Sequence, residues 1–231
     1  MIDKVITEGM SFALPLFVMA IGGIYSERSG ITNLALEGLQ GTGAFVGALT
    51  AVLLKNLLSP DSQIPYYVAL FMAIIGGMLY SMLHALLCIR FQANQVISGV
   101  VINILATALT TFLTKLINRL AFGTVSDRFV LGVSPRWTVP ILSQIPILGA
   151  FFTNRYPFEW IIVAVAIIAW YILYKTKYGL HLRACGDNPQ AVDAAGINVA
   201  KVRFLAVMAS GALSGLAGIS FAYSISANYS L

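Results

Sequence analysis

Four polar residues with hydrogen-bonding or ionisable side chains lie within strongly apolar stretches of this 231-residue chain. Asn33, Glu37 and Gln40 occur in one stretch, and Asn103 occurs in another. A carboxylate in the hydrocarbon of a membrane costs about 2.5 kcal/mol or more, so such groups face other helices or a water-filled path. We expect Asn33 and Glu37, four residues apart, to share a helix face. The four residues are predicted either to line the pathway of a polar solute or to join helices by hydrogen bonds.

Two His–Cys pairs have the four-residue spacing that places both side chains on one helix face. His84 precedes Cys88, and His181 precedes Cys185. Together the pairs could form a Cys2His2 zinc site, but His84 lies inside an apolar stretch and nothing in the sequence brings the pairs together. We therefore expect no metal, and two reduced thiols near a cytoplasmic face.

The chain carries none of the short motifs that mark common enzyme sites. It has no GxSxG or HExxH sequence and no GxxxxGK(S/T) phosphate-binding loop. We expect no catalytic residue, no bound cofactor and no ATPase site of its own in this chain.

Composition indicates the elements that position these residues. The chain is 58% hydrophobic and 10% charged, and its mean hydropathy is +0.85. A membrane-spanning helix needs about 17–25 apolar residues, and six such stretches cover residues 10–26, 31–54, 66–89, 96–118, 158–174 and 202–225. The sequence predicts an all-α polytopic membrane protein with about six transmembrane helices in one domain, residues 1–231. The first ten residues lack the basic region and cleavage site of a signal peptide.

Positive charges cluster around the last two apolar stretches and the polar loop 175–201 between them. The clustered residues are Lys175, Lys177, Arg183, Lys201 and Arg203. This bias predicts that the loop faces the cytoplasm and that the N-terminus lies outside. The basic residues are not interleaved with aromatic ones, so we expect no nucleic-acid partner.

The segment 119–157 is rich in proline. It contains Pro135, Pro140, Pro146 and Pro157. Because proline removes a backbone donor and disrupts helix interiors, no transmembrane helix fits here. We expect an extracellular cap that lies on the membrane surface or dips into it, with a short interfacial helix.

Small residues recur at a four-residue spacing in two of the apolar stretches. Gly43 and Gly47 form one such pair, and Gly211 and Gly215 form another. Small residues allow helices to approach closely in lipid. The pairs are predicted to serve packing within the bundle or, alternatively, a face between two subunits.

A short helix is predicted inside the polar loop. Asp187 or Asn188 can cap it, Pro189 suits its first turn, and Gly196 can end it. A helix of two turns does not persist alone in water, so it must pack on something. Its side chains are small except for Val192, which we expect to be an exposed apolar knob. The helix is predicted to insert into a shallow groove on another protein or to lie on its own bundle.

The sequence around this loop resembles a known family. "GLHLRACGDNPQAVDAAGINV" followed by "RFLAVMASGALSGLAG" is similar to permease subunits of bacterial ABC importers of the branched-chain amino acid/ribose class. "ERSGITNLALEGLQGTGAFVGA" and "ANQVISGVVINILA" resemble the nucleoside-transporting subgroup, and Glu37 matches the glutamate of its NLxxEG stretch. The resemblance implies a type II importer fold, usually with further helices at the C-terminus. It also implies a coupling helix for the ATPase, formed here by Gly186, Asp187, Asn188, Pro189, Ala191, Val192, Ala195 and Gly196.

The resemblance also implies partners and a location. It implies a multi-pass protein of the bacterial plasma membrane that imports nucleosides by alternating access. ATP and Mg²⁺ would be used by separate cytoplasmic ATPase subunits, and solute would arrive on an extracellular substrate-binding lipoprotein. A second permease subunit, identical or paralogous, would complete the pore. The alternatives are a permease for sugars or branched-chain amino acids, a self-contained carrier or channel with Glu37 as its coupling group, and an assembly protein without transport activity.

Overall fold

The computed structural model describes residues 2–58, 62–131, 136–140, 142–144, 148–225 and 228–229. In these ranges six helices are long and apolar enough to cross a membrane. They are α1 (Ile2–Arg28), α2 (Leu36–Leu57), α3 (Ile64–Ala85, continued by the π-helical turn η1, Leu86–Arg90), α4 (Gln95–Ala121), α5 (Pro157–Lys175) and α8 (Val199–Ile225). The prediction of an all-α membrane protein with six spans is confirmed.

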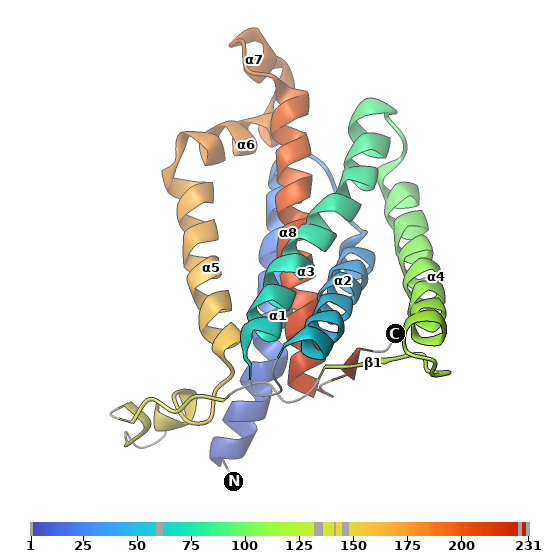
Figure 1. Cartoon of the computed structure of the whole chain (residues 1–231). Coiled ribbons are helices and arrows are strands. Elements are labelled where there is room, and N and C mark those ends of the chain that lie inside the picture. The colour runs from blue at the N-terminus through green and yellow to red at the C-terminus, as the bar shows by residue number, and fades with distance from the viewer. Residues whose placement is uncertain are drawn as a thin grey trace.

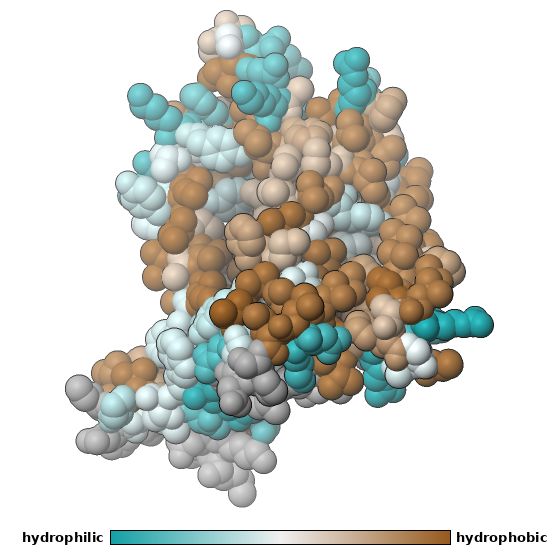
Figure 2. All heavy atoms as spheres, in the orientation of Figure 1, coloured by the Kyte–Doolittle hydropathy of each residue, from teal (hydrophilic) through white to brown (hydrophobic). Residues whose placement is uncertain are grey.

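The helix α8 forms the centre of the bundle (Figure 1). It packs against α1, α2 and α3. The helix α4 packs mainly on α2 at one side, and α5 packs on α1 at the other. Hydrophobic side chains cover the middle of the molecule, and hydrophilic ones gather at its two ends, one of which carries the short helices α6 (Lys177–Asp187) and α7 (Pro189–Ala194) (Figure 2). The bundle therefore has the surface of a protein that crosses a bilayer.

Small residues bring the central helices together. A Cβ atom added to Gly43 of α2 would meet the backbone of Gly215 in α8, and one added to Gly77 of α3 would meet the carbonyl of Gly211. Close backbone approach of this kind is how helices associate in lipid. The glycine pairs therefore serve packing within the chain, as the first of the two alternatives predicted.

The bundle end opposite α6 and α7 is closed by irregular structure. The strand β1 (Phe129–Val130) pairs antiparallel with β2 (Asn228–Tyr229), and the 3-10 turns η2 (Leu142–Gln144) and η3 (Leu148–Phe151) precede α5. These turns occupy the place of the expected interfacial helix. The prediction that no transmembrane helix occupies this proline-rich segment is confirmed for its described residues; Pro135 and Pro146 lie outside them.

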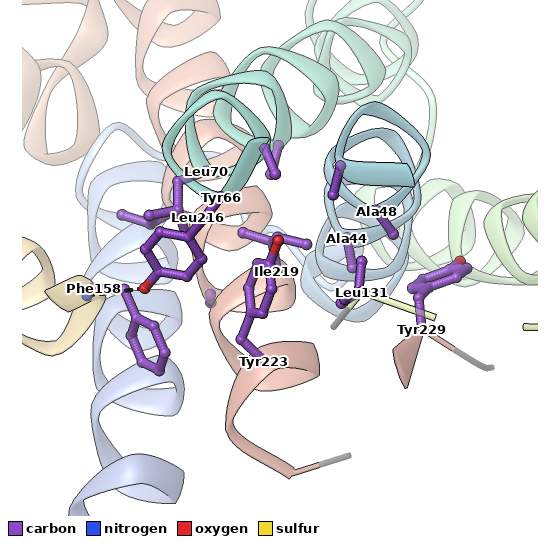
Figure 3. Close-up of a cluster of buried hydrophobic side chains, with 14 of the residues drawn as sticks. Ala44, Ala48, Tyr66, Leu70, Leu131, Phe158, Leu216, Ile219, Tyr223 and Tyr229 are labelled. Atoms are coloured by element: carbon purple, nitrogen blue, oxygen red, sulfur yellow. Dashed lines mark hydrogen bonds between the residues drawn. The ribbon is translucent and has the colours of Figure 1, made fainter. Parts of the chain in front are cut away.

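Aromatic side chains pack the core beneath this cap (Figure 3). Tyr66 of α3 and Tyr223 of α8 meet edge to face, with ring centroids 4.8 Å apart. The Tyr66 hydroxyl also accepts a hydrogen bond of 3.2 Å from the backbone N–H of Phe158, at the start of α5. One cluster thus joins three spanning helices.

Candidate functional site

The short helix α7 forms as the sequence predicts. The Oδ1 atom of Asn188 accepts a hydrogen bond of 3.0 Å from the N–H of Ala191, which caps the helix, and Pro189 occupies the first turn. Gly196 has a φ of +79°, a left-handed conformation that favours glycine and ends the helix. The helix projects beyond the end of α8 (Figure 1).

Val192 is not the exposed knob that we expected. Its side chain is 6% exposed and packs in a cluster with Leu182, Cys185 and Val202. A helix this short needs a tertiary anchor, and its one large apolar side chain supplies it. The prediction of an exposed Val192 is therefore wrong, and its part in ATPase coupling stays a prediction. The exposed residues of this segment are Gly186, Asp187, Asn188, Gln190, Ala191, Asp193, Ala194, Ala195 and Gly196.

A second helix, α6, was missed in the sequence. The Thr176 hydroxyl accepts a hydrogen bond of 3.2 Å from the N–H of Gly179 and caps this helix. Gly179, Leu182 and Cys185 form its buried face, and their three-residue spacing was the signal available. Burial raises the pKa of the Cys185 thiol above its ordinary value, only partly opposed by the charge of Arg203. The thiol is therefore protonated at neutral pH.

Arg203 of α8 joins three elements at this end of the bundle. Its Nε donates to the carbonyl of Ser29, at 2.9 Å, and its Nη2 donates to the carbonyl of Cys185, at 3.0 Å. These carbonyls follow or belong to the last turns of α1 and α6, where backbone acceptors lack partners in the helix. A cation there also complements the helix dipoles. The sequence indicated no such role for Arg203.

The connection between α1 and α2 is not helical. We expected Asn33 and Glu37 on one helix face, but α2 begins at Leu36, so Asn33 precedes it and the prediction is wrong. Figure 1 shows the connection running down along the bundle before α2 starts. Asn33 is buried; its Nδ2 donates to the Oγ of Ser210 at 2.9 Å, and its Oδ1 accepts from the N–H of Ala35 at 3.0 Å.

Side chains of α4 and its first turn bind the backbone of the same connection. Asn103 donates to the carbonyl of Leu34 and accepts from the N–H of Gly38, both at 2.8 Å. Gln95 accepts from the N–H of Thr32 at 2.7 Å. Backbone that leaves a helix at membrane depth must find such partners. The predicted hydrogen-bonding role is thus confirmed for Asn103.

Glu37 and Gln40 lie in the first turns of α2, on its less buried side. Glu37 is exposed and Gln40 is partly buried. An acidic residue in the first turn of a helix is favoured by the helix dipole. Since a carboxylate is not expected to face lipid, a pathway role for these two residues stays a prediction.

The His–Cys pairs lie on separate elements. His84 lies at the end of α3 and Cys88 in η1. The Nδ1 of His84 lies 2.9 Å from the Oγ of Ser98, and both ring nitrogens of His84 lie 3.7 Å from the Sγ of Cys88. His181 and Cys185 belong to α6. Among the described residues, no three His, Cys, Asp or Glu side chains gather as a metal site would require.

A cavity of about 630 Å³ lies beside α7. The connection between α7 and α8 forms one wall, and the end of α3 with the residues that follow it forms another. Its polar lining residues are Gln92, Gln95, Asp193, Asn198 and Arg203. Asp193 and Gly196 are exposed and also line the cavity, so the cavity adjoins the exposed face of α7.

Comparison with known proteins gives the family. A family model described as "Branched-chain amino acid transport system / permease component" matches residues 5–230. The chain belongs to this permease family. With its six spanning helices, this permease is a multi-pass protein of the plasma membrane.

Curated relatives of the permease cover nearly its whole length. The nucleoside ABC transporter permease protein NupC of Lactococcus lactis subsp. cremoris is 38% identical over 228 residues, which are 98% of this chain and 69% of NupC. The guanosine ABC transporter permease protein NupQ of Bacillus subtilis is 37% identical over 226 residues, 97% of this chain and 69% of NupQ. The putative glucose ABC transporter permease protein TsgC13 of Haloferax volcanii is 32% identical over 92% of this chain and 61% of TsgC13. No solved structure matches the chain.

Proposed function

We propose that the permease is the membrane-spanning subunit of an ATP-driven importer of nucleosides. The similarity to NupC and NupQ over at least 97% of the chain carries this proposal. ATP and Mg²⁺ are used by separate cytoplasmic ATPase subunits, which agrees with the lack of a phosphate-binding loop in the sequence. An external binding lipoprotein delivers the solute to the cap, and a second permease subunit, identical or paralogous, completes the pathway.

The exposed side of α7 is the surface that the ATPase contacts in this scheme. Ala191, Ala194 and Ala195 are exposed there, and small side chains permit a close approach to a shallow groove. Val192 holds α7 on the bundle from beneath. A force on α7 can then pass to α6 and, through Arg203, to α8 and the connection before α2.

The start of α2 is where this movement meets the proposed solute pathway. The residues predicted to line the pathway surround this point. Asn33 lies in the connection, Glu37 and Gln40 in the first turns of α2, and Asn103 on the facing helix α4. Coupling requires that nucleotide-bound and nucleotide-free ATPase contact the two states of the permease differently, because equal binding to both shifts nothing. Displacing Ser29 relative to Asn33 would move the first turn of α2 and change access to Glu37.

Reconstituted uptake tests the proposal. The permease, its ATPase subunits and its binding lipoprotein are placed in proteoliposomes, and uptake of radiolabelled guanosine is measured with and without ATP. We expect uptake only with ATP and all partners. Guanosine uptake by the permease alone under an ion gradient would contradict the proposal and favour a self-contained carrier. ATP-driven uptake of ribose or leucine in place of guanosine would assign the permease to sugars or branched-chain amino acids.

The contact surface on α7 has its own test. Ala194→Trp places a bulky ring on the exposed face of α7. The control, Val125→Trp, places the same ring at a fully exposed position at the opposite end of the bundle. We expect the ATPase to co-purify with the Val125 variant and not with the Ala194 variant, while both permeases unfold at the same temperature. If the ATPase co-purified equally with both variants, α7 would not be part of the surface that the ATPase contacts.

A further inference from the structure

The helix α6 lies across the end of α5 and crosses the direction of the spanning helices (Figure 1). Three cationic side chains belong to the junction of these two helices. Lys175 and Lys177 are exposed and Arg183 is partly exposed. Among the described residues no ion pair within 4.0 Å involves these three cations; the pairs of Arg128 with Asp127 and of Arg155 with Glu159 do not include them. The positive charge of the junction is thus not neutralised by the described part of the chain.

Aromatic rings of α5 lie directly under two of these cations. The Lys175 Nζ is 5.7 Å from the centre of the Trp170 ring, and the Arg183 Cζ is 5.3 Å from that of Tyr174. Both rings are exposed, Trp170 at 53% and Tyr174 at 42%. Exposed Trp and Tyr next to basic residues are typical of the interface between hydrocarbon and headgroups.

Apolar side chains continue this surface toward the middle of the membrane. Ile167 and Ile168 of α5 are 62% and 57% exposed, and their place on a spanning helix suits acyl chains. On α6, Leu180 is 57% exposed although the opposite face of the helix is buried. A helix in the interface plane buries such a side chain at the acyl boundary while its cations reach the headgroups.

We propose that Trp170, Tyr174, Lys175, Lys177 and Arg183 form a binding site for the headgroup phosphate of an anionic phospholipid such as phosphatidylglycerol. Lys177 and Arg183 contact the phosphate, and the rings of α5 contact the glycerol and upper acyl region. Lys175 and Arg183 lie over exposed rings of α5, whereas α7 projects away beyond the end of α8 (Figure 1). This placement favours lipid over the ATPase as the occupant. The proposal requires only that the permease resides in a bilayer, so it stands apart from the transported solute.

The test compares lipid retention by matched charge variants. The purified permease is equilibrated in nanodiscs with equal amounts of phosphatidylglycerol and phosphatidylcholine, and bound lipid is measured by native mass spectrometry after release. Near a membrane surface each cation contributes roughly a fivefold preference for anionic lipid. In the double variant Lys177→Gln/Arg183→Gln, the preference for phosphatidylglycerol over phosphatidylcholine should therefore fall roughly 25-fold. The control Lys115→Gln/Arg119→Gln removes two exposed cations from α4 and should keep it.

Two further measurements separate lipid binding from other causes. The charge-retaining variant Lys177→Arg/Arg183→Lys should keep the preference, which shows that the effect follows charge and not misfolding. The proposal is overturned if the wild type shows no preference for phosphatidylglycerol, or if both Gln double variants lose it equally. It is also overturned if Lys177→Gln/Arg183→Gln keeps the lipid but loses the ATPase, because the patch would then be a protein contact.

Discussion

Replacing Arg203 by methionine should release α6 from the bundle without unfolding the spanning helices. The guanidinium makes two hydrogen bonds to backbone carbonyls, of 2.9 and 3.0 Å, to Ser29 and Cys185. A hydrogen bond from a charged group contributes about 1.5–3 kcal/mol. Only the bond to Cys185 ties α6 to the bundle, and because Arg203 is partly exposed, water replaces part of it in the variant, which leaves a loss of about 1–2 kcal/mol for α6. Methionine keeps the aliphatic packing of the side chain, so the loss reports the hydrogen bonds.

Hydrogen exchange measures this loss as local opening. Because 1.4 kcal/mol corresponds to a factor of ten in an equilibrium constant, a loss of about 1–2 kcal/mol predicts roughly 5- to 30-fold faster exchange of the α6 amides. The core amides of α8 should exchange as in the wild type. Lys201→Met is the control, because it removes an exposed cation half a turn away. If exchange in α6 were the same in both variants, Arg203 would not be what holds α6.

Three further predictions follow from contacts of single residues. Gly215→Ala should lower the unfolding temperature in detergent by several degrees because its Cβ would meet the backbone of α3, whereas Gly9→Ala, which meets nothing within 4 Å, should leave it unchanged or raise it. The Cys185 thiol, buried and with a raised pKa, should react with iodoacetamide at pH 7.5 at least tenfold more slowly than a free cysteine, and equal rates would show that α6 is open. Glu159→Gln should destabilise the permease by about 3 kcal/mol in chemical unfolding, because it removes the negative charge that faces the buried Arg155 guanidinium at 3.4 Å; a change below about 1 kcal/mol would refute this.

The six spanning helices were predictable because a run of about 20 apolar residues has few other stable structures in a membrane. The start of α2 was not. Hydropathy is the same whether residues 31–35 are helical or extended, and the choice depends on partners far along the chain. Asn103 lies 69 residues from Leu34, whose carbonyl it binds, and Ser210 lies 177 residues from Asn33. Pattern alone does not show such pairings.

In the polar loop, too, some features were predictable from the sequence and others were not. The cap by Asn188, the place of Pro189 and the stop at Gly196 are local effects, and they were predictable from residue type. The burial of Val192 depends on where α6 places Leu182. A short helix with one large apolar side chain can turn it toward the bundle or toward a partner, and only the tertiary structure decides between them.

The side of the membrane on which α7 lies tests the central claim most directly, because an ATPase can drive the permease only from the cytoplasm. A cysteine is introduced at the exposed Ala194 or, as the control at the opposite end, at the exposed Val125. The two native cysteines are buried and give little background. In intact cells a membrane-impermeant maleimide should label Val125→Cys and should label Ala194→Cys only after permeabilisation. Labelling of Ala194→Cys in intact cells would contradict the account.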